Sequence, residues 1–407
     1  MMGEIMGRKY SGYMSFQYLE PGIDYKKFDL AKEIDRVEPY QVPLSETEER
    51  RVKELYRKSI VIALHDHAIR LPTDLTQLME WSREGRYATA YGGLSASCID
   101  AIFDNLTNGF AYITSKSGWR FEDVVCDLGM RLSDMAHQDF LIRCERVKDI
   151  LKAHAEGKVA FIPSIEGATP IEKELDRIDV LYGLGIRMIG IAYSESNMLG
   201  SGLKEESDGG LTYFGHQAVE RMNKIGMAID IAHSGDKTSL DTIKASKKPV
   251  FISHAGARGV WNSKRMKPDE VIKACAERGG IIGIEASPQT TFSRKHPQMD
   301  IESVMDHFVY CVDLVGIDHV GFGLDTLYGN HVWLHEVLSG GLSMSQITFD
   351  LTTKETPKRV EYVKGMENPT EGYNNIVRWL VKHGYSDEEI GKVVGGNVLR
   401  VLQEVWY

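Results

Sequence analysis

The chain has 407 residues, of which 43% are hydrophobic and 26% are charged, and its formal net charge at pH 7 is −10. Such a composition supports a large core, while no apolar run approaches the roughly 20 residues that a membrane span requires. The acidic balance and the lack of a dense Lys/Arg cluster exclude nucleic acid and anionic membranes as expected partners, so the sequence predicts a small-molecule ligand. The five cysteines form no C-x-x-C pair, and their odd number argues against a disulfide framework.

The N-terminal region predicts an arm followed by a helix. Residues 1–45 are rich in Tyr, Gly and Pro, and we expect them to lie over the body of the protein or over a partner subunit. Ser45 and Glu48 form a capping-box pattern that predicts a helix over residues 45–58. The first 15 residues mix charges with glycine and lack the apolar core of a secretory signal, so we expect a cytoplasmic protein.

The first predicted strand ends in a pair of histidines. An apolar and β-branched run from Ser59 leads to His65 and His67, which are separated by one residue. Because residues i and i+2 of a strand point the same way, the two imidazoles should converge on one point, as metal ligands do at the mouth of a barrel. The alternative is a pair of histidines that only caps the strand.

Four more apolar runs end at a residue that can bind a metal ion or transfer a proton. They cover residues 159–165, 226–232, 249–253 and 319–324, and they stop at Glu166, His233, His254 and Asp325 respectively. Further strands are expected over residues 93–99, 186–192 and 280–285. Segments with helical periodicity lie between most of the strands, over residues 172–184, 214–224, 237–246, 268–278 and 300–315.

This alternation of eight strands with helices predicts an α/β fold, a (β/α)8 TIM-type barrel. We expect one barrel domain over residues 46–407, preceded by the arm as an N-terminal extension. The active sites of such barrels lie at the C-terminal ends of the strands, where the polar residues gather.

A long loop is expected after strand 8, over residues 326–369. Long loops at this face of a barrel often form lids, and packing on a second subunit is the alternative. His331 and His335 have the i,i+4 spacing of a helical metal pair, but no carboxylate base lies between them, so we assign them to the same segment. Its aromatic residues could close over an apolar part of a substrate: Tyr328, Trp333 and Phe349.

The residues at the strand ends also carry a family resemblance. From about residue 59 to the C-terminus, the chain resembles the membrane (renal) dipeptidase family of metallopeptidases. The order and spacing of the motifs agree: His65-Asp-His67, Ser164-Ile-Glu166-Gly, Ile229-Asp-Ile-Ala-His233-Ser, Ile252-Ser-His254-Ala and the run from Gly316 to Asp325. The first 45 or so residues fall outside the resemblance.

The resemblance implies a binuclear metal site, usually zinc, that hydrolyses the amide bond of a dipeptide with a free carboxylate. It implies that His65 and His67 bind one ion and that His233 and His254 bind the other. Glu166 would bridge both ions. Two further residues are expected at the positions of family residues that bind the substrate carboxylate and handle the proton, Arg265 and Asp325 respectively.

Two positions depart from the family pattern. The family usually has aspartate where this chain has His67, so the site loses one negative charge. Tyr193 stands where the family places a substrate-contacting histidine, which weakens the expectation of a standard dipeptide. Asn197, on the loop after strand 4, is a further expected substrate contact. Glu285, at the end of strand 7, could pair with a substrate amine or form a structural salt bridge.

The donor set itself favours hydrolysis. Two metal ions roughly 3.5–4 Å apart can share a hydroxide, because a bound ion lowers the pKa of water to about 7. Glu166 can bridge through its two oxygens, and Asp325 can move the proton to the leaving nitrogen. We therefore expect a homo-oligomeric hydrolase with two divalent ions, zinc by preference, that cleaves a dipeptide or similar small carboxylate-bearing amide. The alternatives are a non-peptide amide or lactone hydrolase and a metal-binding protein with little catalysis.

Overall fold

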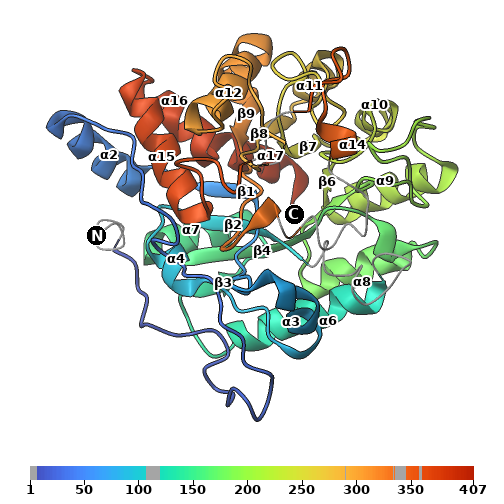
Figure 1. The fold of residues 1–407 in the computed structure, drawn as a ribbon. Coiled ribbons are helices and arrows are strands. Elements are labelled where there is room, and N and C mark those ends of the chain that lie inside the picture. Colours follow the sequence, from blue (N-terminus) through green and yellow to red (C-terminus); the bar gives the residue numbers. More distant parts are fainter. Residues whose placement is uncertain (1–6, 107–119, 289, 333, 335–344, 357–359) are drawn as a thin grey trace.

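The computed structural model describes residues 7–106, 120–288, 290–332, 334, 345–356 and 360–407. At its centre a parallel sheet curls into a barrel with helices outside it (Figure 1). The strands pair in the order β1-β2-β4-β5-β6-β7-β8-β9, and the short β3 pairs with β4. The predicted (β/α)8 barrel is thereby confirmed. The strands are β1 (Ile62–Asp66), β2 (Ala101–Asn105), β3 (Leu141–Arg143), β4 (Val159–Ile165), β5 (Met188–Gly190), β6 (Ala228–Asp230), β7 (Phe251–Ala255), β8 (Ile281–Ile284) and β9 (Val320–Phe322).

Hydrogen bonds beyond the strand ends close the ring between β9 and β1. The backbone N–H of Asp325 donates to the carbonyl of His65 at 3.1 Å, and that of His67 donates to the carbonyl of Thr326 at 2.9 Å. The seam of the barrel therefore brings Asp325 against the two histidines.

The helices that follow the strands agree with the sequence periodicity. Five of them lie where they are predicted: α8 (Asp176–Leu184), α9 (Tyr213–Ile225), α10 (Asp236–Ala245), α11 (Asp269–Glu277) and α12 (Ile301–Val315). The N-terminal α2 (Glu46–Lys58) begins with the predicted capping box between Ser45 and Glu48. The other α-helices are α3 (Leu78–Glu84), α4 (Tyr91–Ser95), α6 (Phe121–Met135), α7 (Val147–Glu156), α14 (Ser345–Thr348), α15 (Pro369–Lys382), α16 (Asp387–Gly391) and α17 (Asn397–Val405). None of the helices in the described part of the chain is both long and apolar enough to cross a bilayer.

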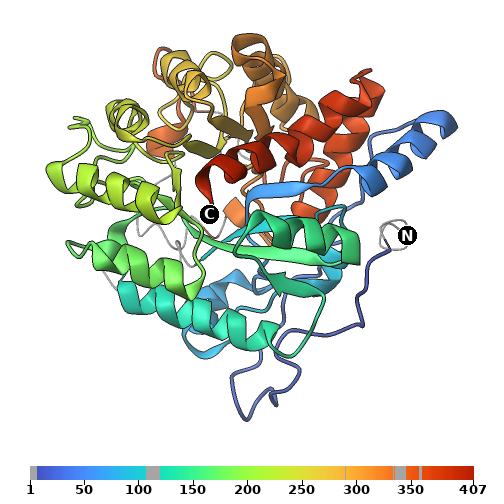
Figure 2. The ribbon, with the colours of Figure 1, turned by 180° about the vertical axis from the view of Figure 1, so that it is seen from behind.

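The inside of the barrel packs against the C-terminal helix. The first residues of several strands, among them Ile62, Phe251 and Ile281, form one buried cluster with Val401 and Leu402 of α17. Seen from behind, α17 (red) lies across this end of the barrel (Figure 2). With the N-terminal ends of the strands covered by a helix, the opposite, C-terminal ends carry the polar residues.

The position of one predicted strand is wrong. The sequence predicts a strand over residues 93–99, whereas the structure has α4 over Tyr91–Ser95 and the second strand over Ala101–Asn105. Contacts distant in sequence favour the helix, because the Gly93 N–H donates to the Glu33 carboxylate at 2.8 Å. A side chain at Gly93 would also lie 2.6 Å from the ring of Tyr328, so only glycine allows this approach.

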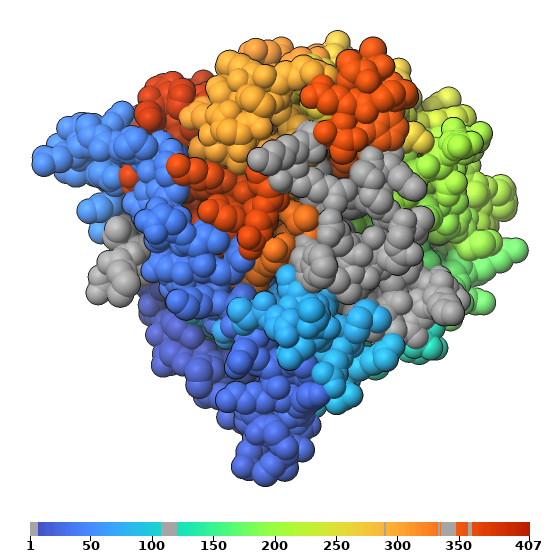
Figure 3. Space-filling view, in the orientation of Figure 1, coloured from blue at the N-terminus to red at the C-terminus, as the bar shows by residue number. Residues whose placement is uncertain are grey.

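The described part of the N-terminal arm, residues 7–45, lies against the barrel. Asp134 on α6 accepts hydrogen bonds from the Tyr13 hydroxyl at 2.7 Å, the Ser15 hydroxyl at 2.5 Å and the Phe16 N–H at 2.7 Å. Figure 3 shows this dark blue segment at the lower edge of the molecule, next to the lighter blue surface of the following residues. The arm is thus anchored on the same body that carries the polar strand ends.

Candidate metal centre

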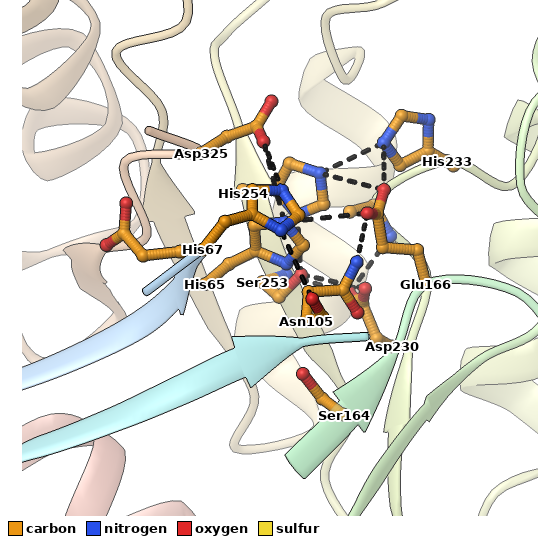
Figure 4. A network of polar contacts seen from close by, with 12 residues as sticks. His65, His67, Asn105, Ser164, Glu166, Asp230, His233, Ser253, His254 and Asp325 are labelled. Atoms are coloured by element: carbon orange, nitrogen blue, oxygen red, sulfur yellow. Dashed lines mark hydrogen bonds and ion pairs between the residues drawn. The ribbon is translucent and has the colours of Figure 1, made fainter. Parts of the chain in front are cut away.

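Six side chains that can bind a metal ion meet at the C-terminal ends of the strands (Figure 4). Their ligand atoms form three overlapping groups, and the atoms of each group lie within 4.8 Å of one another. The groups are His65, His67 and Glu166; His65, His254 and Asp325; and Glu166, His233 and His254. The structure thus brings together all the residues that the sequence suggests as metal ligands, together with Asp325.

Strand geometry explains how these side chains reach one point. Residues of a strand alternate between its faces, so Glu166 continues the inward row of Ala160 and Ile162 on β4. His65 and His254 instead fall within short register irregularities of β1 and β7. Irregularities of this kind re-aim side chains next to functional sites. The rings of His65 and His254 consequently stack, with their centroids 3.6 Å apart.

Glu166 lies between the two histidine pairs. Its Oε1 is 3.8 Å from Nε2 of His65, and its Oε2 is 3.2 Å from Nε2 of His233 and 3.8 Å from Nε2 of His254. Each oxygen of one carboxylate therefore faces a different group. β5 lies so close to the backbone of Glu166 that position 190 has to be glycine. A Cβ atom at Gly190 would lie 1.8 Å from the carbonyl oxygen of Glu166.

Asp325 faces the first histidine pair from the end of β9. Its Oδ1 is 3.6 Å from Nε2 of His65 and 3.3 Å from Nε2 of His67. The backbone of Asp325 has a φ of 55°, which is rare for a residue other than glycine. Hydrogen bonds hold this conformation, because the next residue, Thr326, donates its N–H and its hydroxyl to Asp66 at 2.9 and 2.8 Å. Strained residues of this kind are concentrated at functional sites.

Hydrogen bonds fix the protonation pattern of two imidazoles. Ser253 donates its hydroxyl to Asp230 at 2.7 Å, so its oxygen accepts from Nδ1 of His254 at 2.8 Å. Nδ1 of His67 lies 3.2 Å from the carbonyl of Asn105, which can only accept. Both rings therefore carry a proton on Nδ1. Nε2 of His254 presents a lone pair to the cluster, whereas Nε2 of His67 faces the carboxylate of Asp325.

These lone pairs fit a cation. Nε2 of His233 lies 2.9 Å from Nε2 of His254, and Nε2 of His65 is buried without a hydrogen-bond partner among the described residues. Neighbouring imidazole lone pairs next to a carboxylate repel one another unless a proton or a metal ion lies between them. The residues present are thus suited to hold divalent metal ions.

The electrostatics of the buried cluster keep its donors available. Burial, assisted by the charge of Arg265, lowers the pKa of His233 to about 4. Burial also holds the pKa of His254 well below its usual range. Burial opposes ionisation of Glu166, but the hydrogen bond with His233 and the charge of His65 outweigh it and lower its pKa to about 2. At neutral pH His233 and His254 are therefore neutral and Glu166 is ionised, the forms that bind metals. At His67, burial opposes the charged form, but the hydrogen bond to Asp325 and its charge outweigh burial and raise the pKa to about 9, so a metal ion has to displace a proton there.

The structure adds two residues that the sequence does not single out as part of the site. Asn105, at the end of β2, donates its amide Nδ2–H to Oε1 of Glu166, and its carbonyl faces His67. The sequence does not reveal Asn105, because the second strand is predicted over residues 93–99 and Asn105 then does not stand at its end. The other site residues are recognised as polar residues at the ends of predicted strands. His331 is buried with Nε2 3.9 Å from Oδ1 of Asp325, so it lies beside the cluster, whereas its proposed helical partner His335 falls outside the described residues.

Tyr193 and Asn197, two expected substrate contacts on the loop after β5, lie in different settings. The ring of Tyr193 stacks on the ring of His233, with centroids 4.3 Å apart. Asn197 uses its amide within its own loop, donating to the carbonyl of Ile191 at 2.8 Å and accepting from the Leu199 N–H at 2.8 Å. The geometry therefore brings Tyr193 to the cluster and gives Asn197 a loop-building contact.

Arg265 and Glu285, the other expected substrate contacts, pair with each other. Nη2 of Arg265 meets Oε2 of Glu285, and the same nitrogen donates to the carbonyl of His254 at 3.0 Å. Both side chains are buried, at 1% and 0% exposure. The sequence allows Glu285 either to pair with a substrate amine or to form a structural salt bridge, and the structure shows the salt bridge.

The predicted lid residues are only partly described. Tyr328 is buried, and its hydroxyl is 2.9 Å from that of Thr370, so it belongs to the core beside Gly93. Phe349 is half-buried, with the Lys354 ammonium 5.2 Å from its ring centroid. Trp333 lies outside the described residues.

Comparisons with known proteins point to one family. The family model of membrane dipeptidase (peptidase family M19) matches residues 49–335 and 359–406. Over 282 residues the chain is 27% identical to the dipeptidase tcpJ of Claviceps purpurea (strain 20.1), a match that spans 69% of this chain and only 58% of that relative's length. An amidohydrolase from Pseudomonas aeruginosa superposes with a TM-score of 0.69 at 27% identity, over 87% of this chain and 99% of that one. A metallopeptidase from Rhodobacter sphaeroides shares the fold, with a TM-score of 0.63 at 20% identity over 86% and 100% of the two chains.

Proposed function

The chain belongs to the membrane dipeptidase family, and we propose that it is a metal-dependent hydrolase that cleaves the amide bond of a dipeptide or a similar small carboxylate-bearing amide. One observation carries the proposal: Glu166 takes part in two groups of potential metal ligands, one with His65 and His67 and the other with His233 and His254. A carboxylate shared between two such groups is the arrangement that a two-metal hydrolase requires.

We assign the residues of the centre as follows. Two divalent ions, zinc by preference, would acidify a water molecule and polarise the scissile carbonyl when bound. His65 and His67 would hold one ion, His233 and His254 the other, and Glu166 would contact both. Asp325 would take the proton of the nucleophile and deliver it to the leaving nitrogen. Tyr193, stacked on His233, would donate its hydroxyl to the developing oxyanion.

The second candidate is a hydrolase of a non-peptide amide or lactone on the same barrel. The buried pair between Arg265 and Glu285 favours it, because an arginine that already has a carboxylate partner is less suited to bind the carboxylate of a dipeptide. Tyr193 also favours the second candidate, since a phenol cannot exchange protons near neutral pH as an imidazole does.

A substrate panel tests the proposal. Metal-replete protein is assayed with a set of dipeptides and, separately, with simple amides and lactones, and each assay is repeated after removal and return of the metal. Glu166→Gln, which should fold but bind metal poorly, is the matched control. We expect turnover of at least one dipeptide that disappears with the metal and is absent from the variant.

The other outcomes separate the alternatives. Turnover of amides or lactones without any dipeptide would establish the second candidate. Stable metal binding without turnover of either set would identify a metal-binding protein with little catalysis. The cytoplasmic location and the homo-oligomeric state stay predictions from the sequence. Light scattering coupled to size-exclusion chromatography measures the oligomeric state.

A further inference from the structure

A buried ion pair forms part of the wall beside the candidate metal centre. Glu285 follows β8 directly, between the ends of β7 and β9, which carry His254 and Asp325. Arg265 meets this carboxylate through Nη2 and donates from the same nitrogen to the carbonyl of His254. The pair is therefore attached to the backbone of a proposed metal ligand.

The pair is held rigidly. One oxygen of Glu285 faces Arg265, and the other accepts a hydrogen bond from the Thr290 hydroxyl. The backbone N–H of Glu285 donates to the carbonyl of Ala255 at 3.2 Å, and that of Arg265 donates to the carbonyl of Ile347 at 3.0 Å. Because both backbones and both carboxylate oxygens are engaged, Glu285 cannot turn away from Arg265 without leaving several polar groups unpaired.

The pairing changes what Arg265 can recognise. A lone buried guanidinium would attract a carboxylate strongly, whereas a guanidinium whose charge is matched would place the incoming carboxylate beside a second negative charge at low dielectric. Nη1 of Arg265 is buried and has no hydrogen-bond partner among the residues that the structure describes. The pair thus offers the two N–H groups of Nη1 and no net charge, which suits a neutral oxygen.

We propose that Glu285 sets the substrate class of the hydrolase, because by matching the charge of Arg265 it makes the site favour an uncharged oxygen acceptor over a free carboxylate. The acceptor would be the carbonyl of an ester, a lactone or an amidated C-terminus. This inference rests on the proposed hydrolase function, and within that function it favours the substrates of the second candidate, which lack a free carboxylate.

Matched substrates test the proposal on metal-loaded protein. The value of kcat/KM is measured for a dipeptide and for its C-terminal amide, and the ratio of acid to amide is compared between variants. In the wild type the amide should be at least as good a substrate as the acid. Glu285→Gln frees the charge of Arg265 and should raise the ratio about tenfold or more in favour of the acid.

A second variant covers the case in which Glu285→Gln does not fold because Arg265 is left unpaired. Arg265→Met with Glu285→Met removes both charges and keeps the wall neutral, so the ratio should stay within about threefold of the wild type. Lys267→Met, which removes a different buried basic side chain two residues from Arg265, is the matched control and should also leave the ratio unchanged. A wild-type preference for the acid, or a ratio that is the same in Glu285→Gln as in the wild type, would overturn the proposal.

A binding measurement keeps this proposal separate from the proposed function. If no substrate is turned over, the hydrolase function fails, but calorimetric titration with N-acetylglycine and N-acetylglycinamide still compares the two ligand charges. The proposal expects Glu285→Gln to shift the ratio of the two dissociation constants about tenfold towards the acid. An unchanged ratio, or no binding of either probe to any variant, would refute it.

Discussion

Asn105→Ala should weaken metal binding without unfolding the protein. Asn105 is buried, with 1% exposure, and its amide donates to Oε1 of Glu166, which is itself only 6% exposed. This contact orients the carboxylate that we assign to both ions. Its carbonyl contact to His67 is made by the backbone and survives the substitution.

The size of the effect follows from the type of contact. A hydrogen bond to a charged acceptor contributes about 1.5–3 kcal/mol. Loss of a group that orients a metal ligand typically lowers metal affinity about 10–100-fold, which agrees with that energy. We therefore expect the dissociation constant of at least one ion to rise by about this factor, while the circular dichroism spectrum stays that of the wild type.

Competition with a coloured zinc chelator measures the affinity of each site. Ser164→Ala is the matched control, because Ser164 is buried on the neighbouring β4 and donates to the carbonyl of Asp104 at 3.4 Å, away from the cluster (Figure 4). Its affinities should stay within about twofold of the wild type. Unchanged metal affinities in Asn105→Ala would refute the role given to the amide.

The remaining predictions concern proton transfer, the arm and pH. Glu166→Gln should lose both metal and turnover, whereas Asp325→Asn should keep most metal and lose about 10²–10⁴-fold in kcat; full turnover of the latter would remove its proposed role. Asp134→Ala should lower the free energy of unfolding by about 3–5 kcal/mol and expose residues 7–45 to protease, because the three donors of the arm and the Tyr91 hydroxyl all lose their acceptor. An arm that stays uncut would argue against this anchor. Burial lowers the pKa of Lys267 to about 7 from 10.5, so between these values the unfolded chain binds the extra proton and stability rises with pH. Denaturant titrations should show that the free energy of unfolding rises by up to about 1.4 kcal/mol per pH unit in this range. In Lys267→Met this rise should be smaller.

The sequence predicts the strands that end in metal ligands because pattern and chemistry coincide there. The apolar runs before Glu166, His233 and His254 each stop at a residue that a core cannot bury alone. A parallel α/β barrel then brings these ends together without further information. The fold and the convergence of the cluster therefore follow from local signals.

The second strand and the two additional site residues depend on contacts that no local pattern contains. Gly93 to Ser95 form a helix because Tyr328 and Glu33, both distant in sequence, pack on them. Asn105 is found only once the strand before it is placed correctly. His331 faces Asp325 because the chain after β9 carries it back to the end of that strand.

The environment of Arg265 is also a tertiary property. Together with Lys264 and Lys267, it resembles a solvated basic turn in the sequence, but Arg265 and Lys267 are buried at 1% and 2% exposure. Glu285, twenty residues later, supplies the carboxylate that makes this burial possible. A charge pattern predicts exposure only where no distant partner compensates it.

Elemental analysis of the purified protein counts the metal ions that the proposed centre holds. After growth or refolding with excess zinc, we expect close to two divalent ions per chain in the wild type and a large loss in Glu166→Gln, because the proposed centre shares this one carboxylate between both sites. One ion per chain would show that His67 has weakened a site. A metal content near zero in the wild type, or an equal content in Glu166→Gln, would contradict the two-metal centre.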